Sequence, residues 1–278
     1  MKLKSKVAII TGGSGGIGFK IAEAYLREGA RVMISARRED ELVRAFKELK
    51  TISPEVACQV ADVSKIEDCL ALVSKTEKTF KPVDILVNSA GIYGPIGPSA
   101  EVDIKHWKQT YEINVFGTFQ MIQAVLSKMI ERKSGKIINF SGGGDGPLPN
   151  FSAYNSSKGA IVRLTETLAA EVKGYNVDIN CIAPGPVNTK FLEDALSAGE
   201  SKLGKEKYEE LLKQKKDGGV SPEKAADLCL FLASSGSDGL TGKFLSAVWD
   251  KYDDWTKEEV EKISRSDAFT LRRIKWEK

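Results

Sequence analysis

Short apolar runs alternate with longer amphipathic segments along most of this chain. The runs are rich in β-branched residues and predict strands at 7–10, 32–35, 56–60, 83–87, 136–140 and 177–182. The segments between them follow a helical repeat and predict helices at 19–28, 39–49, 66–80, 101–132 with a bend near Thr110, and 152–173. This alternation predicts an α/β fold, a doubly wound, mostly parallel sheet with helices on both faces in a single domain.

The pattern changes after the sixth strand. Residues 189–219 are rich in charge and have only a thin apolar stripe, which is typical either of a solvated helix or of a mobile lid. A further helix at 221–233 and a last strand at 243–249 follow. We expect one domain over residues 1–249, with the lid segment at 189–219, and a C-terminal tail extension over 250–278, where Thr256 and Glu259 have capping-box spacing.

Composition excludes several classes of protein. With 42% hydrophobic and 28% charged residues the chain can bury a core, and its net charge of +3 includes no basic block for nucleic acid or an anionic membrane. The four cysteines are scattered and there is one histidine, so no metal site is predicted. The first apolar run is too short for a signal peptide, and we expect a cytoplasmic protein.

A glycine-rich turn, TGGSGGIG at 11–18, joins the first predicted strand to the first predicted helix. Glycines let the backbone approach a pyrophosphate, and a helix N-terminus offers free N–H groups to it. Two frames fit a dinucleotide fingerprint: Gly13, Gly15 and Gly18, or Gly12, Gly16 and Gly18. A purely structural turn is the alternative.

Tyr154 and Lys158 lie four residues apart at the start of a predicted helix and therefore share one face. A nearby cation favours the phenolate, which suits a tyrosine to acid–base catalysis. The spacing alone is common in surface helices. Position adds weight, because Thr11, Asn88, Ser141 and Pro184 all follow predicted strands, and ligands of such sheets bind beyond the carboxyl ends of the strands.

Taken together, these motifs resemble the single-domain, Tyr-x-x-x-Lys branch of the short-chain dehydrogenase/reductases, up to about residue 248. They comprise TGGSGGIG, Asp62-Val63, Asn-Ser-Ala-Gly at 88–91, Asn114, Ser141, Tyr154-x-x-x-Lys158 and Pro184-Gly185. The resemblance implies a dinucleotide-binding catalytic domain that transfers a hydride between a nicotinamide cofactor and a carbonyl or secondary alcohol.

The resemblance also assigns roles. Tyr154 would be the acid–base, Lys158 would lower the pKa of Tyr154 and bind the nicotinamide ribose, Asn114 would hold a water, and Ser141 would bind the reacting oxygen. Counting from the strand instead places the family serine at Gly142. The family's second asparagine is Ser89 in this chain. The cofactor site would comprise Thr11, Gly12, Ser14, Gly16, Ile17, Gly18, Arg37, Arg38, Asp62, Val63, Asn88, Ala90, Gly91, Tyr154, Lys158, Pro184, Gly185, Val187 and Thr189.

The second strand indicates which cofactor is used. An NAD site holds the ribose 2′-OH with an acidic residue, whereas this strand ends at Ala36 and is followed by Arg37 and Arg38. Guanidinium groups suit a 2′-phosphate, so NADP(H) is favoured and NAD(H) stays an alternative. An NAD-dependent alcohol dehydrogenase and a non-catalytic cofactor-binding regulator are the competing functions.

Assembly and substrate can be predicted only in part. The helices at about 111–132 and 152–173 have more apolar residues than one sheet-facing side requires, which predicts a homodimer or homotetramer. Asp145, Pro147 and Leu148, together with the lid, should line the pocket for a small carbonyl or alcohol substrate. No charge pattern there identifies that substrate.

Overall fold

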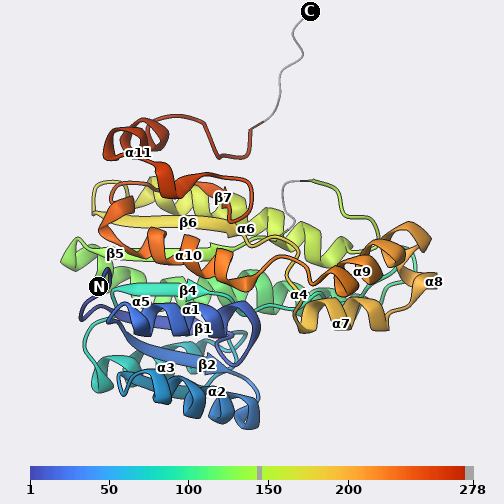
Figure 1. Cartoon of the computed structure of the whole chain (residues 1–278), viewed down its shortest axis with the longest axis horizontal. Helices are drawn as coiled ribbons and strands as arrows, with labels where there is room; N and C mark the ends of the chain where they lie inside the picture. Colours follow the sequence, from blue (N-terminus) through green and yellow to red (C-terminus); the bar gives the residue numbers. More distant parts are fainter. Residues whose placement is uncertain (143–145, 273–278) are drawn as a thin grey trace, which may run out of the picture.

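A central parallel sheet organises the structure. The computed structural model describes residues 1–142 and 146–272. In these residues seven strands pair in the order β3-β2-β1-β4-β5-β6-β7, every neighbouring pair parallel (Figure 1). The strands are β1 (Val7–Thr11), β2 (Arg31–Ala36), β3 (Val56–Val60), β4 (Ile85–Asn88), β5 (Gly135–Phe140), β6 (Val177–Ala183) and β7 (Phe244–Ser246). The predicted doubly wound sheet is confirmed.

The burial of the strands explains the apolar runs. Every residue of β1 and β4 is buried, because these strands lie in the middle of the sheet and have helices on both faces. The chain goes outward from β1 to β2 and β3, then returns past β1 to form β4. This reversal between β1 and β4 opens a crevice at the carboxyl ends of the strands.

Two layers of helices cover the sheet. One apolar cluster joins it to α1 (Gly16–Arg27), α2 (Glu39–Ile52) and α10 (Pro222–Ala233), which Figure 1 shows on the near side. A second cluster joins the opposite face to α3 (Ile66–Thr79), α5 (Gly117–Arg132) and α6 (Ser152–Glu171). Three helices lie beyond the carboxyl ends of the strands: α7 (Lys190–Ser197), α8 (Glu200–Leu203) and α9 (Lys205–Asp217).

The predicted helix at 101–132 consists of three parts. It begins as α4 (Ile104–Tyr111), where the Asp103 side chain accepts a hydrogen bond from the N–H of Lys105. A π-helical turn, η1 (Glu112–Phe116), then leads into α5. The irregularity therefore falls just beyond the predicted bend at Thr110. π-helical turns of this kind are frequent at functional sites, and this one contains Asn114.

The last strand is much shorter than predicted. The prediction of 243–249 is wrong in its second half, since β7 ends at Ser246. There the Ser246 N–H donates to the Asp250 carboxylate at 2.7 Å, and the Ser246 hydroxyl accepts from the N–H groups of Val248 and Trp249. These local hydrogen bonds form a turn after Ser246, so residues 247–249 do not continue the strand.

The tail packs along the outer edge of β7. It contains η3 (Tyr252–Asp254) and α11 (Lys257–Ser264), and the predicted capping box of Thr256 and Glu259 is present. Beyond α11 the Phe269 carbonyl accepts from the Phe244 N–H at 2.8 Å, and the carbonyls of Ser266 and Ala268 accept from the buried Lys243 ammonium. The tail thus covers an edge that would otherwise expose unpaired backbone groups.

Candidate active site

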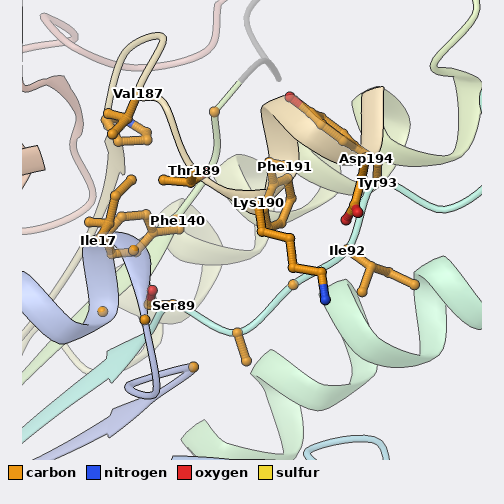
Figure 2. A pocket seen from close by; sticks show the side chains of 18 of the residues that line it. Ile17, Ser89, Ile92, Tyr93, Phe140, Val187, Thr189, Lys190, Phe191 and Asp194 are labelled. Atoms are coloured by element: carbon orange, nitrogen blue, oxygen red, sulfur yellow. The ribbon is translucent and has the colours of Figure 1, made fainter. Parts of the chain in front are cut away.

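One large cavity lies at the carboxyl edge of the sheet. Its volume is about 1530 Å³, and its walls include residues at the ends of β2, β5 and β6 and in the loops after β1 and β4. Residues of helices α7 and α9 form the remaining wall of the cavity. Figure 2 shows Ile17 and Ser89 on one side of this space and Tyr93, Phe191 and Asp194 on the other.

The glycine turn forms one wall. Gly12 and Gly16 adopt positive φ angles of +68° and +54°, which favour glycine, and a Cβ on Gly18 would lie only 2.5 Å from the Gly12 carbonyl oxygen. A Cβ on Gly15, in contrast, would meet nothing within 4 Å. The frame of Gly12, Gly16 and Gly18 is thus constrained at all three positions, whereas the other frame is constrained at Gly13 and Gly18 but not at Gly15. Helix α1 begins at Gly16 without a side-chain cap, so its first N–H groups suit a pyrophosphate.

Cationic side chains follow β2 at the far end of this wall. Arg37 and Arg38 are exposed and line the cavity, as does Arg44 on α2, which the sequence analysis missed. Glu41 forms an ion pair with Arg38. The nearby Ser35 hydroxyl is buried and, within the described part of the chain, has no hydrogen-bond partner. An unpaired hydroxyl beside guanidinium groups fits a sugar phosphate.

Tyr154 and Lys158 lie together on α6, as their spacing predicts. Both are buried, and the Lys158 ammonium lies 5.6 Å from the centroid of the Tyr154 ring. The ammonium donates a 2.8 Å hydrogen bond to the Phe140 carbonyl, whereas the Tyr154 hydroxyl contacts the Gly142 carbonyl at 3.5 Å. The two functional groups therefore face one end of the cavity.

Burial controls the ionisation of this pair. It raises the pKa of Tyr154 well above that of a free phenol, and the neighbouring Tyr93 raises it further. Burial also lowers the pKa of Lys158 to about 8. The expected lowering of the Tyr154 pKa by Lys158 does not prevail in this arrangement, because desolvation of the buried phenol is the larger effect. Tyr154 is thus held in its neutral, protonated form.

Asn114 connects three elements behind the pair. Its Oδ1 accepts from the Ile92 N–H at 2.9 Å, and its Nδ2 donates to the Ile92 carbonyl at 2.9 Å and to the Ser157 hydroxyl at 3.0 Å. Ser157 in turn donates to the carbonyl of Tyr154. The π-helical turn thus ties the loop after β4 to the helix that carries the tyrosine.

The family's serine was predicted at Ser141 or, counting from the strand, at Gly142, and these two positions have different surroundings. Ser141 is 2% exposed, lines the cavity, and its N–H donates to the Ile182 carbonyl at 2.9 Å. Gly142 adopts φ +93°, and a Cβ there would lie 2.8 Å from the Tyr154 hydroxyl. The backbone at Gly142 therefore approaches the phenol more closely than any side chain at that position would allow.

Four of the predicted site residues do not line the cavity but support its wall. Thr11 accepts from the Ala90 N–H, and one oxygen of the Asp62 carboxylate accepts from Ser64. Asn88 donates to Asn139 at 2.9 Å, and Asn114 holds the backbone as described above. The other predicted residues line it: Gly12, Ser14, Gly16, Ile17, Gly18, Arg37, Arg38, Val63, Ala90, Gly91, Ser141, Tyr154, Lys158, Pro184, Gly185, Val187 and Thr189.

Several lining residues were not named individually from the sequence, although one of them, Phe191, lies in the lid segment 189–219 that was expected to line the pocket. Tyr93, Phe151 and Phe191 form an aromatic wall next to Tyr154. Tyr93 could have been found, because it lies two residues beyond the Asn-Ser-Ala-Gly motif, at the end of a central strand. Pro147 and Leu148 line the cavity as predicted, and Asp145 lies outside the described residues.

Comparisons with known proteins agree with this geometry. The family model described as short chain dehydrogenase matches residues 6–199, and the chain belongs to this family. Human dehydrogenase/reductase SDR family member 4 is 34% identical over 242 residues, which are 87% of this chain and 85% of the relative.

Two solved structures are similar over most of the chain. NAD⁺-bound xylitol dehydrogenase superposes with a TM-score of 0.81 at 27% identity and covers 88% of this chain and 98% of its own. A substituted form of actinorhodin polyketide ketoreductase, solved with NADPH, has a TM-score of 0.80 at 29% identity. The match covers 90% of this chain and 98% of the ketoreductase chain. The protein is therefore an NAD(P)-dependent oxidoreductase acting on alcohol or carbonyl groups.

Proposed function

We propose that this protein is an NADP(H)-dependent reductase of ketones, acting reversibly on secondary alcohols, with Tyr154 as acid–base. The observation that carries the proposal is the buried pair of Tyr154 and Lys158 at the end of a cavity whose other end is a glycine turn. Because burial raises the pKa of Tyr154, the phenol carries the proton that carbonyl reduction consumes.

In this proposal each residue of the site has a separate role in the reaction. The bound nicotinamide supplies or accepts the hydride. Tyr154 donates its phenolic proton to the substrate oxygen as negative charge develops there, and Ser141 hydrogen-bonds the same oxygen. Lys158 binds the nicotinamide ribose and stabilises the phenolate that forms. Asn114 keeps the backbone around the pair in place through its hydrogen bonds to Ile92 and Ser157.

The ribose end of the cavity favours NADP(H). Ala36 stands where an acidic residue would bind a 2′-OH, and Arg37 and Arg38 line the same region. The similar solved structures include both NAD⁺ and NADPH complexes, so NAD(H) is the alternative cofactor. A regulator that only bound the cofactor would have no use for a proton donor buried at the opposite end of the cavity.

Absorbance at 340 nm tests the chemistry. Oxidation of NADPH by simple ketones is expected, and Tyr154→Phe should abolish it while leaving cofactor affinity nearly unchanged. Activity of Tyr154→Phe within about tenfold of wild type would reject the assigned role.

The arginines test the choice of cofactor. Arg37→Ala and Arg38→Ala should each weaken NADPH binding roughly 10- to 150-fold and NADH binding little, because each removes a charge-assisted contact to the 2′-phosphate. Arg265→Ala is the matched control, since this exposed side chain pairs with Glu261 on the distant α11. Equal losses for both cofactors would refute the proposed preference.

Assembly and location are proposals that the surface supports in different degrees. Most apolar residues of α5 and α6 are buried in the chain's own core, Leu168 among them, but Phe116 and Phe119 are 56% and 38% exposed. These two rings support a homodimer or homotetramer that covers the end of η1 and the start of α5. No helix among residues 1–142 and 146–272 is long and apolar enough to cross a membrane. A cytoplasmic location stays a prediction from the sequence.

A further inference from the structure

The end of the cavity beyond Tyr154 is walled by aromatic rings. The Tyr93 ring lies at their centre, with centroids 4.6 Å from Tyr154, 4.8 Å from Phe191 and 5.2 Å from Phe151. The interplanar angles of 60–71° make each of these contacts edge-to-face. Figure 2 shows Tyr93 and Phe191 on the same side of the cavity.

Three separate parts of the chain build this wall. Tyr93 comes from the loop after β4, Phe151 precedes α6, and Phe191 lies in the first turn of α7. The apolar side chains of Leu148, Leu192 and Leu211 extend the same lining. Edge-to-face contacts hold the rings at fixed angles, so the wall is formed before a ligand arrives.

The charged residues at this end comprise two of each sign, and Asp194 lies close to the aromatic wall, because burial and then this carboxylate raise the pKa of Tyr93. Lys190 and Asp194 on α7 are exposed, and Lys207 and Glu210 on α9 pair with each other at 2.8 Å. Among the described lining residues, the buried cation is Lys158, whose ammonium donates to the Phe140 carbonyl. This part of the cavity, as far as the structure describes it, therefore lacks a second buried charge that would neutralise a carboxylate, sulfonate or phosphate on a substrate.

We infer that the substrate is an uncharged ketone with a ring, aromatic or fused alicyclic, next to the carbonyl group. Its ring stacks on the wall of Tyr93 and Phe191 while its oxygen reaches the Tyr154 hydroxyl. This inference rests on the proposed function: a hydride adds to the carbonyl carbon, the C=O π pair becomes the O–H bond, and Tyr154 supplies the proton. Polyols and keto acids are disfavoured, because their polar groups would face the rings unpaired.

Matched ketones test the inference through kcat/KM with saturating NADPH. 4-Methylacetophenone should exceed 4-acetylbenzoate, which has the same shape with a carboxylate, by at least about 30-fold, because an unpaired charge is buried. 2-Tetralone should exceed the open-chain 2-octanone by roughly 3- to 10-fold, because aromatic contacts add to area burial. Phe191→Leu should bring the kcat/KM ratio of 2-tetralone to 2-octanone close to one while leaving NADPH affinity unchanged.

Controls separate the wall from the fold. Leu196→Ala shortens an apolar residue of α7 that packs in the same cluster but does not line the cavity, and it should keep both ratios. Equal or better turnover of 4-acetylbenzoate would overturn the inference and point to Lys190 as an anchor for an anion. Turnover of 2-octanone as fast as 2-tetralone would also overturn it and leave the proposed function standing. If no ketone oxidises NADPH or NADH, the proposed function fails, and this inference with it.

Discussion

The buried Lys158 should contribute stability that increases with pH between about 8 and 10.4, which is the opposite of what buried tyrosines and cysteines contribute there. Burial lowers the pKa of Lys158 to about 8 in the folded protein, whereas a lysine in the unfolded chain has a pKa of about 10.4. Between these two values the unfolded chain binds a proton that the folded protein does not. Replacing this lysine by methionine removes the titrating group and nearly keeps its length.

The sign and size follow from linkage. Below about pH 8 both states carry the charge, and the full cost of burying it is present. As pH rises from about 8 to about 10.4 the Lys158 ammonium of the folded protein loses its proton, so the contribution of Lys158 to the free energy of unfolding increases by about 1.4 kcal/mol per pH unit. Over the whole window the gain is roughly 3 kcal/mol relative to Lys158→Met.

Urea unfolding between pH 7 and pH 10.5 at constant ionic strength measures the effect. Groups that do not interact with Lys158 cancel in the difference; one is the Cys69 thiol, whose pKa burial raises to about 12. Placing both proteins in a Cys181→Ala background removes the buried Cys181 thiol, which does interact with Lys158. Lys173→Met is the matched control, because this lysine is exposed just beyond the end of α6. Its stability should run parallel to that of the wild type.

A constant difference between wild type and Lys158→Met across this range would refute the reasoning. It would mean that the ammonium keeps its ordinary pKa, through water or through the Phe140 carbonyl that accepts its hydrogen bond. A difference that falls with pH would be more damaging, because it would mean that the folded protein stabilises the charge.

Four other perturbations test separate parts of the structure. Ser141→Ala should lower kcat about 10²–10³-fold if its hydroxyl stabilises the oxyanion; a negligible loss would assign that role to the backbone at Gly142. Asn114→Ala removes the hydrogen-bond partners of the Ile92 N–H and carbonyl, and should lower the free energy of unfolding measured in urea by roughly 2–4 kcal/mol. An unchanged free energy of unfolding would mean that water replaces the amide. Phe119→Glu should lower the mass measured by light scattering at micromolar concentration; an unchanged mass would remove α5 from the interface. Deleting residues 265–278 strips the Lys243 ammonium of its carbonyl partners and should lower Tm by roughly 5–10 °C, whereas an unchanged Tm would make the tail dispensable.

The fold was largely predictable because the central strands are buried on both faces. Burial on both faces requires a continuous apolar run, and such runs can be read without knowledge of their neighbours. The last strand was the exception. Residues 247–249 are apolar, yet hydrogen bonds of Ser246 with Asp250 and with the following N–H groups end β7 early. Local side-chain competition of this kind leaves no trace in hydrophobic periodicity.

In the candidate site, too, features with local requirements could be predicted from the sequence, and features that depend on distant segments could not. The glycine turn and the pair of Tyr154 and Lys158 could be predicted, because their requirements are local: a positive φ, a helix N-terminus, a spacing of four residues. The ring at the centre of the aromatic wall could not be placed in this way. Tyr93 meets Phe151 and Phe191 only after the sheet has brought together the loop after β4, the start of α6 and the start of α7.

The elements, their alternation and the helix face shared by Tyr154 and Lys158 could be read from the sequence, since each depends on residues close together in the chain. The tertiary structure alone decided the ionisation of Tyr154, the outer edge of the sheet and the aromatic lining of the cavity. The physical reason is that desolvation, edge pairing and ring contacts depend on which segments become neighbours in space. Burial of Tyr154 against Tyr93 raises the pKa that a neighbouring lysine was expected to lower.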